Sequence, residues 1–151
     1  MKKKTITLIG GSGFLAKFCI SELLKDGHNV KVVCRNPHQA GNLRMMGTID
    51  QLDIYSGNII NKDSIEPFIR NSNIIINLVG ILFESNGNQT FQNCHAIGPK
   101  NIAELAKKHD IERLIHFSSI GADINSESKY QKSKGIGEKH IIENFPKSTI
   151  I

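Results

Sequence analysis

The sequence is poor in cysteine, has no tryptophan and contains no long apolar run. Its three cysteines, Cys19, Cys34 and Cys94, are odd in number and form no CxxC pair, which excludes a fully paired disulfide framework and argues against a zinc site. We therefore expect free thiols in a reducing compartment and no bound metal. Because no stretch of about 18 apolar residues occurs, we also expect no membrane-spanning helix.

A formal net charge of +5 comes from 19 Lys and Arg against 14 Asp and Glu. Two interpretations stay open: lysines scattered over the surface, or attraction to an anionic partner such as a cofactor phosphate or a lipid surface. Nucleic acid is the least favoured partner, because no basic stripe is interleaved with aromatic residues. The apolar stretch after the lysines at 2–4 is interrupted by glycines, unlike a secretion signal. We expect a cytoplasmic protein, with peripheral attachment to the inner membrane as the alternative.

Short apolar runs alternate along the chain with longer segments of helical periodicity. The runs predict strands at residues 5–9, 30–34, 49–55, 73–79 and 113–117, and the start of a sixth at 149–151. The intervening segments predict helices at 14–25, 63–70, 90–109 and 128–145, and a short helix that opens at Asn36-Pro37. This alternation predicts an α/β fold: one domain with a doubly wound parallel sheet of order 3-2-1-4-5 and a partial strand 6.

The first predicted strand runs directly into the segment GGSGFLA at residues 10–16, which opens the first helix. Gly10 allows a tight turn, and Gly13 lets the backbone approach a pyrophosphate closely. The free N–H groups at the start of the helix favour an anion there. Because a strand precedes and a helix follows, a purely structural turn is the less favoured interpretation. We predict that Gly10, Ser12, Gly13, Phe14 and Leu15 bind a dinucleotide on a Rossmann fold.

The residue that contacts the adenosine ribose is expected about 20 positions further on, at the end of the second strand. An acidic residue there favours NAD(H), but this chain has Cys34-Arg35-Asn36. A guanidinium can bind a 2′-phosphate with two hydrogen bonds, whereas a carboxylate repels it. We therefore predict that Arg35 favours NADP(H); NAD(H) is the alternative cofactor, and a solvated surface arginine is the alternative role.

With these motifs the chain resembles the extended and atypical short-chain dehydrogenase/reductases, the NAD-dependent epimerase/dehydratase-like proteins, over essentially all of its length. The segment NLVG at residues 77–80 resembles the N-x-A-G segment that lies beside the cofactor in that family. Asn58 follows the third predicted strand, where family members often contact adenine. The resemblance implies that Asn58, Asn77, Val79 and Gly80 contact the cofactor.

Three segments are similar to one branch of that group: NLVGILFE at 77–84, LIHFSSIGAD at 114–123 and SKYQKSKGIGE at 128–138. The branch contains the nucleotide-binding α-subcomplex accessory subunit of respiratory complex I and its bacterial relatives. That subunit holds NADPH tightly, with no established turnover. The resemblance therefore implies binding more strongly than catalysis, and it implies respiratory complex I or another membrane-associated complex as a partner.

Tyr130 and Lys134 match the family's Tyr-x-x-x-Lys pair. Residues four apart share a helix face, and an ammonium beside a phenol lowers the phenol pKa toward the range useful for proton transfer. The resemblance implies that Ser119, Tyr130 and Lys134 are catalytic, with the last two also contacting the cofactor. His95 lies near the family's active-site asparagine and departs from its pattern. The alternative is an exposed tyrosine on a lysine-rich helix.

Two functions are compatible with these expectations. The first is an NAD(P)H-binding protein, with NADP(H) favoured and little or no turnover. The second is an NADP-dependent oxidoreductase, epimerase or dehydratase that uses Ser119, Tyr130 and Lys134 on a carbonyl or sugar-nucleotide substrate. The family continues into a smaller C-terminal substrate domain. We therefore expect residues 1–151 to be the NAD(P)-binding domain of a truncated chain.

Overall fold

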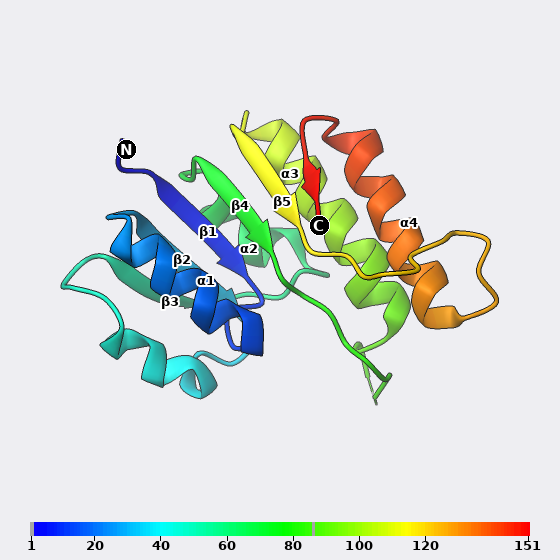
Figure 1. Ribbon diagram of the computed structural model, residues 1–151, viewed down its shortest axis with the longest axis horizontal. Helices are drawn as coiled ribbons and strands as arrows, with labels where there is room; N and C mark the ends of the chain where they lie inside the picture. The colour runs from blue at the N-terminus through cyan, green and yellow to red at the C-terminus, as the bar shows by residue number, and fades with distance from the viewer. Residues whose placement is uncertain (1, 86) are drawn as a thin grey trace.

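The computed structural model describes residues 2–85 and 87–151 and shows strands and helices in strict alternation (Figure 1). In chain order the elements are β1 (Thr5–Ile9), α1 (Phe14–Lys25), β2 (Asn29–Cys34), the 3₁₀ helix η1 (Pro37–Met45), β3 (Leu52–Ser56), α2 (Lys62–Ile69), β4 (Ile74–Asn77), the π-helix η2 (Gln92–Ile97), α3 (Gly98–Lys108), β5 (Arg113–His116), α4 (Lys129–Asn144) and β6 (Thr149–Ile150).

The six strands form one parallel sheet of order β3-β2-β1-β4-β5-β6, which confirms the predicted fold and strand order. From β1 the chain winds outward through β2 to β3, then returns to β4 on the other side of β1 and winds outward again. Ile9, at the end of β1, is therefore paired with Val33 of β2 on one side and with Asn77 of β4 on the other. The carboxyl edge between β1 and β4 is the point where the winding reverses, and ligands of open α/β sheets bind at such points.

Helices cover both faces of the sheet. On one face α2, α3 and α4 bury apolar side chains such as Ile65, Ile102 and Ile141 against the strands. On the other face α1 and η1 pack residues such as Ile20 and Leu43. Successive strand residues alternate between the two cores, as the pleat of a strand requires. The position of the carboxyl edge is thus fixed by two hydrophobic cores.

Most bounds differ from the predicted ones by one or two residues, as at β4, which ends at Asn77 rather than at 79, and two departures are larger. The third strand begins at Leu52 rather than at 49, because a turn with Asp50 at φ 62° and a hydrogen bond from Gln51 N–H to the Thr48 carbonyl precedes it. The helix predicted over 90–109 begins as a π-helix before it becomes α3. A π-turn of this kind is rare and is frequently found at functional sites.

Candidate functional site

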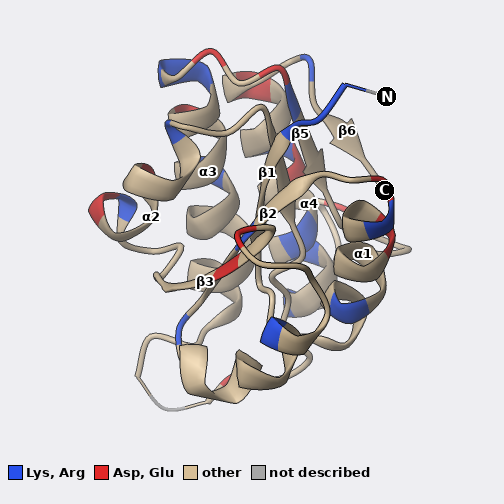
Figure 2. Cartoon of the chain, turned by 90° about the vertical axis from the view of Figure 1, so that its left-hand side faces the viewer, with Lys and Arg blue, Asp and Glu red and all other residues tan. Residues whose placement is uncertain are grey.

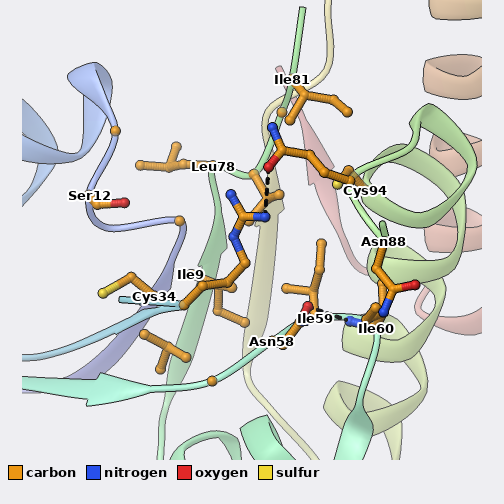
Figure 3. A pocket seen from close by; sticks show the side chains of 18 residues that line it. Ile9, Ser12, Cys34, Asn58, Ile59, Ile60, Leu78, Ile81, Asn88 and Cys94 are labelled. Carbon is orange, nitrogen blue, oxygen red and sulfur yellow. Dashed lines mark hydrogen bonds between the residues drawn. The ribbon is translucent and has the colours of Figure 1, made fainter. Parts of the chain in front are cut away.

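A pocket of about 270 Å³ opens at the carboxyl edge of the sheet. It is lined by residues at the ends of β1 to β4 and in the segments that follow them: Ile9, Gly10, Ser12, Gly13, Val33, Cys34, Arg35, Gly57, Asn58, Ile59, Ile60, Leu78, Val79, Gly80, Ile81, Asn88, Gln89 and Cys94. Figure 3 shows Ser12 on one side of the pocket, facing Asn88 and Cys94 on the other. The pocket therefore lies at the point where the winding of the sheet reverses.

The glycine turn after β1 forms one wall of the pocket. Gly10 has a φ of +90°, and its N–H donates to the Val33 carbonyl at 3.0 Å. A Cβ at Gly10 would lie 3.0 Å from the backbone nitrogen of Val79, so a side chain would be both strained and crowded. Gly13 is the N-cap of α1, whose first turn contains no acidic residue. The N–H groups at this helix start are therefore available to an anionic group in the pocket.

Seven of the predicted cofactor contacts line this single pocket: Gly10, Ser12, Gly13, Arg35, Asn58, Val79 and Gly80. Phe14 and Leu15 lie outside its lining and are 77% and 48% exposed. Asn77, in contrast, is fully buried beneath it. The side-chain carbonyl of Asn77 accepts the N–H of Val79 at 3.1 Å, so Asn77 shapes the backbone that the pocket exposes.

Arg35 is exposed at the mouth of the pocket, where its Nη1 donates to Oε1 of Gln89 at 2.9 Å. Gln89 belongs to the segment between β4 and η2 and was not singled out from the sequence. In the view of Figure 2, Lys and Arg are spread over several helices and lie among Asp and Glu. This distribution favours scattered surface charge over a concentrated basic face.

A buried polar pair lies beneath the pocket, between the sheet and the helices. The side-chain amide of Asn77 donates to Nδ1 of His116 at 2.9 Å. Since Nδ1 accepts, the imidazole proton is on Nε2, and this atom is buried with no hydrogen-bond partner among the described residues. Burial, followed by the positive charge of Lys134, lowers the pKa of His116 from 6.5 to about 3. His116 is therefore neutral at physiological pH.

The three predicted catalytic residues occupy the start of α4 and the loop before it. Lys134 is 3% exposed, its Nζ donates to the Phe117 carbonyl at 2.9 Å, and burial lowers its pKa. Tyr130 packs edge-on against Phe91 and His95. The hydroxyl of Ser119 is buried with no partner in the described part of the chain. Within residues 2–85 and 87–151, no hydrogen bond joins any two of the three, and none of them lines the pocket.

His95 of the π-helix connects the segment after β4 with α4. Its Nε2 accepts the N–H of Ile81 at 3.0 Å, and its Nδ1 donates to Oγ of Ser133 at 2.9 Å. Ser133 in turn donates to the carbonyl of Tyr130 at 2.7 Å. Burial, with a further contribution from the charge of Lys134, lowers the pKa of His95 to about 4. Sequence reasoning missed Ser133, because a single serine inside a helix gives no periodic signal.

We expect the stability of the fold to decrease as the pH falls from about 6.5 toward 4. The pKa values of His95 and His116 are about 4 and about 3 in the fold and 6.5 without it, so the unfolded chain binds protons first. Each histidine then contributes a loss of roughly 2 kcal/mol between about pH 7 and pH 5. Denaturant unfolding at these two pH values measures the difference.

The matched variants are His95→Gln, which should remove about half of this pH dependence, and the exposed His38→Gln, which should leave it unchanged. Equal pH dependence in wild type and His95→Gln would show that His95 is not held neutral by the fold.

The described residues meet neither the requirements of a metal site nor those of a membrane-spanning helix. Residues 2–85 and 87–151 contain no group of three or more His, Cys, Asp or Glu side chains placed to hold a metal ion. The three cysteines are free thiols, two of them buried. Every helix in the described part of the chain is too short or too polar to span a bilayer.

Comparison with known proteins connects this pocket to a family. The family model described as NAD(P)H-binding matches residues 10–145. The chain is 31% identical to the mitochondrial NADH-ubiquinone oxidoreductase 40 kDa subunit of Neurospora crassa, over 97% of this chain and 39% of that protein. It is 34% identical to the mitochondrial NADH dehydrogenase (ubiquinone) 1 alpha subcomplex subunit 9 of Mus musculus, over 96% of this chain and 38% of that protein. The chain thus spans about two fifths of the length of these relatives.

Solved structures give the same architecture. The crystal structure of vestitone reductase from alfalfa superposes with a TM-score of 0.77 at 19% identity and covers 98% of this chain and 56% of that one. This likeness establishes the fold. The stretch that the family model matches, residues 10–145, includes the glycine turn, Arg35 and the three predicted catalytic residues Ser119, Tyr130 and Lys134.

Proposed function

This chain belongs to the NAD(P)H-binding family, and we propose that it holds NADP(H) in the pocket at the carboxyl edge of the sheet, with little or no turnover. The proposal is supported by the convergence of seven predicted contacts on one pocket, from Gly10 at the glycine turn to Gly80 after β4. The pyrophosphate would lie on the N–H groups at the start of α1, and the adenosine would lie toward Arg35 and Asn58.

The preference for the phosphorylated cofactor rests on the charge of the pocket. Among the described residues that line it, none is Asp or Glu, and Arg35 is the one charged side chain. A 2′-phosphate would therefore meet a guanidinium and no carboxylate at the end of β2. NAD(H) would bind the same pocket without this interaction.

We expect Arg35→Ala to weaken NADPH binding about ten- to hundredfold, because a charged hydrogen bond contributes roughly 1.5–3 kcal/mol. NADH affinity should stay within about twofold, since NADH has no 2′-phosphate for Arg35 to bind. Fluorescence titration with both nucleotides measures the ratio of their affinities. Arg70→Ala, an exposed arginine at the end of α2, is the control for the loss of one positive charge. The preference is refuted if both nucleotides lose affinity equally in Arg35→Ala.

The low turnover is supported by the state of the predicted catalytic residues. Lys134 donates to a backbone carbonyl, and Tyr130 packs edge-on against the stacked rings of Phe91 and His95. Neither they nor Ser119 line the pocket. A Tyr-Lys pair can supply the proton that accompanies hydride transfer only when the phenol and the ammonium both face the nicotinamide and the substrate. In this arrangement the chain binds a dinucleotide without presenting a complete proton donor.

The names of two relatives support a proposal for the partner and the location of this chain. Two of them are named as subunits of mitochondrial NADH-ubiquinone oxidoreductases. We extend this to association of the present chain with a respiratory complex or another membrane-associated complex, as a cytoplasmic protein peripheral to the inner membrane. Residues 1–151 would then supply the NAD(P)-binding domain of that assembly. Co-purification with membrane complexes, carrying NADPH that is not consumed, is the test.

One observation favours a second function, that of an NADP-dependent oxidoreductase, epimerase or dehydratase. The hydroxyl of Ser119 is buried and without a partner in the described chain, so its hydrogen-bonding capacity is unused, and a substrate carbonyl placed beside it would satisfy that capacity. Tyr130 and Lys134 lie one turn apart on α4. Hydride transfer that is measurable in the wild-type chain and lost in Tyr130→Phe would establish this function in place of the first.

A further inference from the structure

The hydrogen bond between Arg35 and Gln89 joins two separate walls of the pocket. Arg35 follows β2, whereas Gln89 lies 54 positions later, in the segment between β4 and η2. Both residues line the pocket. The guanidinium is therefore held in one direction by a residue that comes from across the mouth of the pocket.

Two hydrogen bonds fix the backbone at Gln89 and at its neighbour Asn88. The backbone carbonyl of Gln89 accepts the N–H of Ser85 at 3.1 Å. The side-chain amide of Asn93, in the π-helix, donates to the carbonyl of the neighbouring Asn88 at 3.0 Å. The backbone at Asn88 is thus tied to the start of η2, and Gln89 extends its side chain to Arg35 from a backbone that hydrogen bonds hold in place.

The chemistry of the pair leaves Arg35 able to bind an anion. A guanidinium has five N–H donors, and Gln89 accepts from one nitrogen only. The amide of Gln89 is neutral, so it does not cancel the charge of Arg35. The acidic residue of the same segment, Glu84, is engaged elsewhere, because its Oε1 accepts the N–H of Phe91 at 2.7 Å. The positive charge of Arg35 acts on Cys94, which also lines the pocket: it lowers the pKa of this thiol and so opposes the rise that burial causes.

We infer that Gln89 positions Arg35 for the 2′-phosphate of NADP(H) and is therefore a specificity-determining residue of this pocket. The inference rests on the proposed function. A free arginine side chain must give up much rotamer freedom to bind a phosphate, and a guanidinium already fixed by Gln89 gives up less. Discrimination between NADP(H) and NAD(H) would then depend on two residues, of which only Arg35 contacts the phosphate.

The test is a double-mutant cycle on Gln89 and Arg35, read as separate affinities for NADPH and NADH. Gln89→Ala should weaken NADPH binding about three- to tenfold, the effect of one lost positioning hydrogen bond, with NADH within about twofold. Gln89→Glu should weaken NADPH binding more than about tenfold, because a carboxylate would pair with Arg35 and repel the phosphate. Gln92→Ala, an exposed glutamine of η2, is the matched control.

In the Arg35→Ala background, Gln89→Ala should change NADPH affinity no further, since Gln89 acts through Arg35. Equal losses for NADPH and NADH in Gln89→Ala, or the same loss with and without Arg35, would overturn the inference. If Arg35→Ala lowers the preference for NADPH and the Gln89 variants do not, the inference fails and the proposed function stands; if Arg35→Ala leaves the preference unchanged, both fail.

Discussion

Gly13→Val is expected to reduce dinucleotide affinity by at least about a hundredfold, the equivalent of two lost charged hydrogen bonds, while the fold stays intact. Gly13 is the N-cap of α1 with φ −78° and ψ 170°, a conformation that any residue adopts. A Cβ there would contact only the Gly10 carbonyl oxygen, at 3.3 Å. The larger side chain would therefore occupy the pocket wall where the pyrophosphate must approach the backbone.

Nucleotide titration and denaturant unfolding of the same preparation separate the two effects. Unfolding free energy should change by no more than about 1 kcal/mol, the size usual for a change outside the core. Gly13→Ala should give an intermediate loss of affinity, since its side chain intrudes less. Full affinity in Gly13→Val would mean that the cofactor does not cross the glycine turn, and the assignment of the pocket would be wrong.

Gly137→Ala is expected to destabilise the fold by about 3 kcal/mol or more, a large part of the 5–15 kcal/mol typical of a domain. Gly137 lies where α4 packs directly on η2, and a Cβ there would stand 2.0 Å from the backbone carbonyl oxygen of His95. That oxygen belongs to a helix and cannot turn aside like a flexible side chain. The two helices must separate, which also disturbs the contact between His95 and Ser133.

Gly41→Ala is the matched control, because nothing lies within 4 Å of its added Cβ. It should be neutral or stabilising by about 0.4–1 kcal/mol, through lower entropy of the unfolded chain. Thermal and denaturant unfolding of both variants measure the contrast. A Gly137→Ala variant as stable as Gly41→Ala would show that α4 does not approach η2 this closely.

The fold could be predicted from the sequence because its signals are local and repeated. The apolar run at Asn73–Val79, the glycine turn at Gly10 and the helical spacing after Phe14 each specify an element without knowledge of the others. Right-handed crossovers then leave few strand orders. The carboxyl edge, and with it the grouping of Arg35 and Asn58 in one pocket, follows from that order.

What the sequence could not supply are contacts made across the fold by single side chains. The pairing of Gln89 with Arg35 depends on how the segment after β4 turns back over the pocket, and no periodic pattern encodes that path. The roles of His95 and Ser133 depend likewise on the close approach of η2 and α4. The family pattern marked Asn77 as a cofactor contact, whereas its fully buried position became visible only with His116 beside it.

The most direct test of the account is a titration of the purified chain with NADPH and with NADH, followed by nicotinamide fluorescence. We predict saturable binding of NADPH at micromolar or lower concentration, tighter than that of NADH, at a stoichiometry of one nucleotide for each pocket. A chain that unfolds cooperatively, and is therefore folded, yet binds neither nucleotide would contradict the central claim that this pocket holds a dinucleotide.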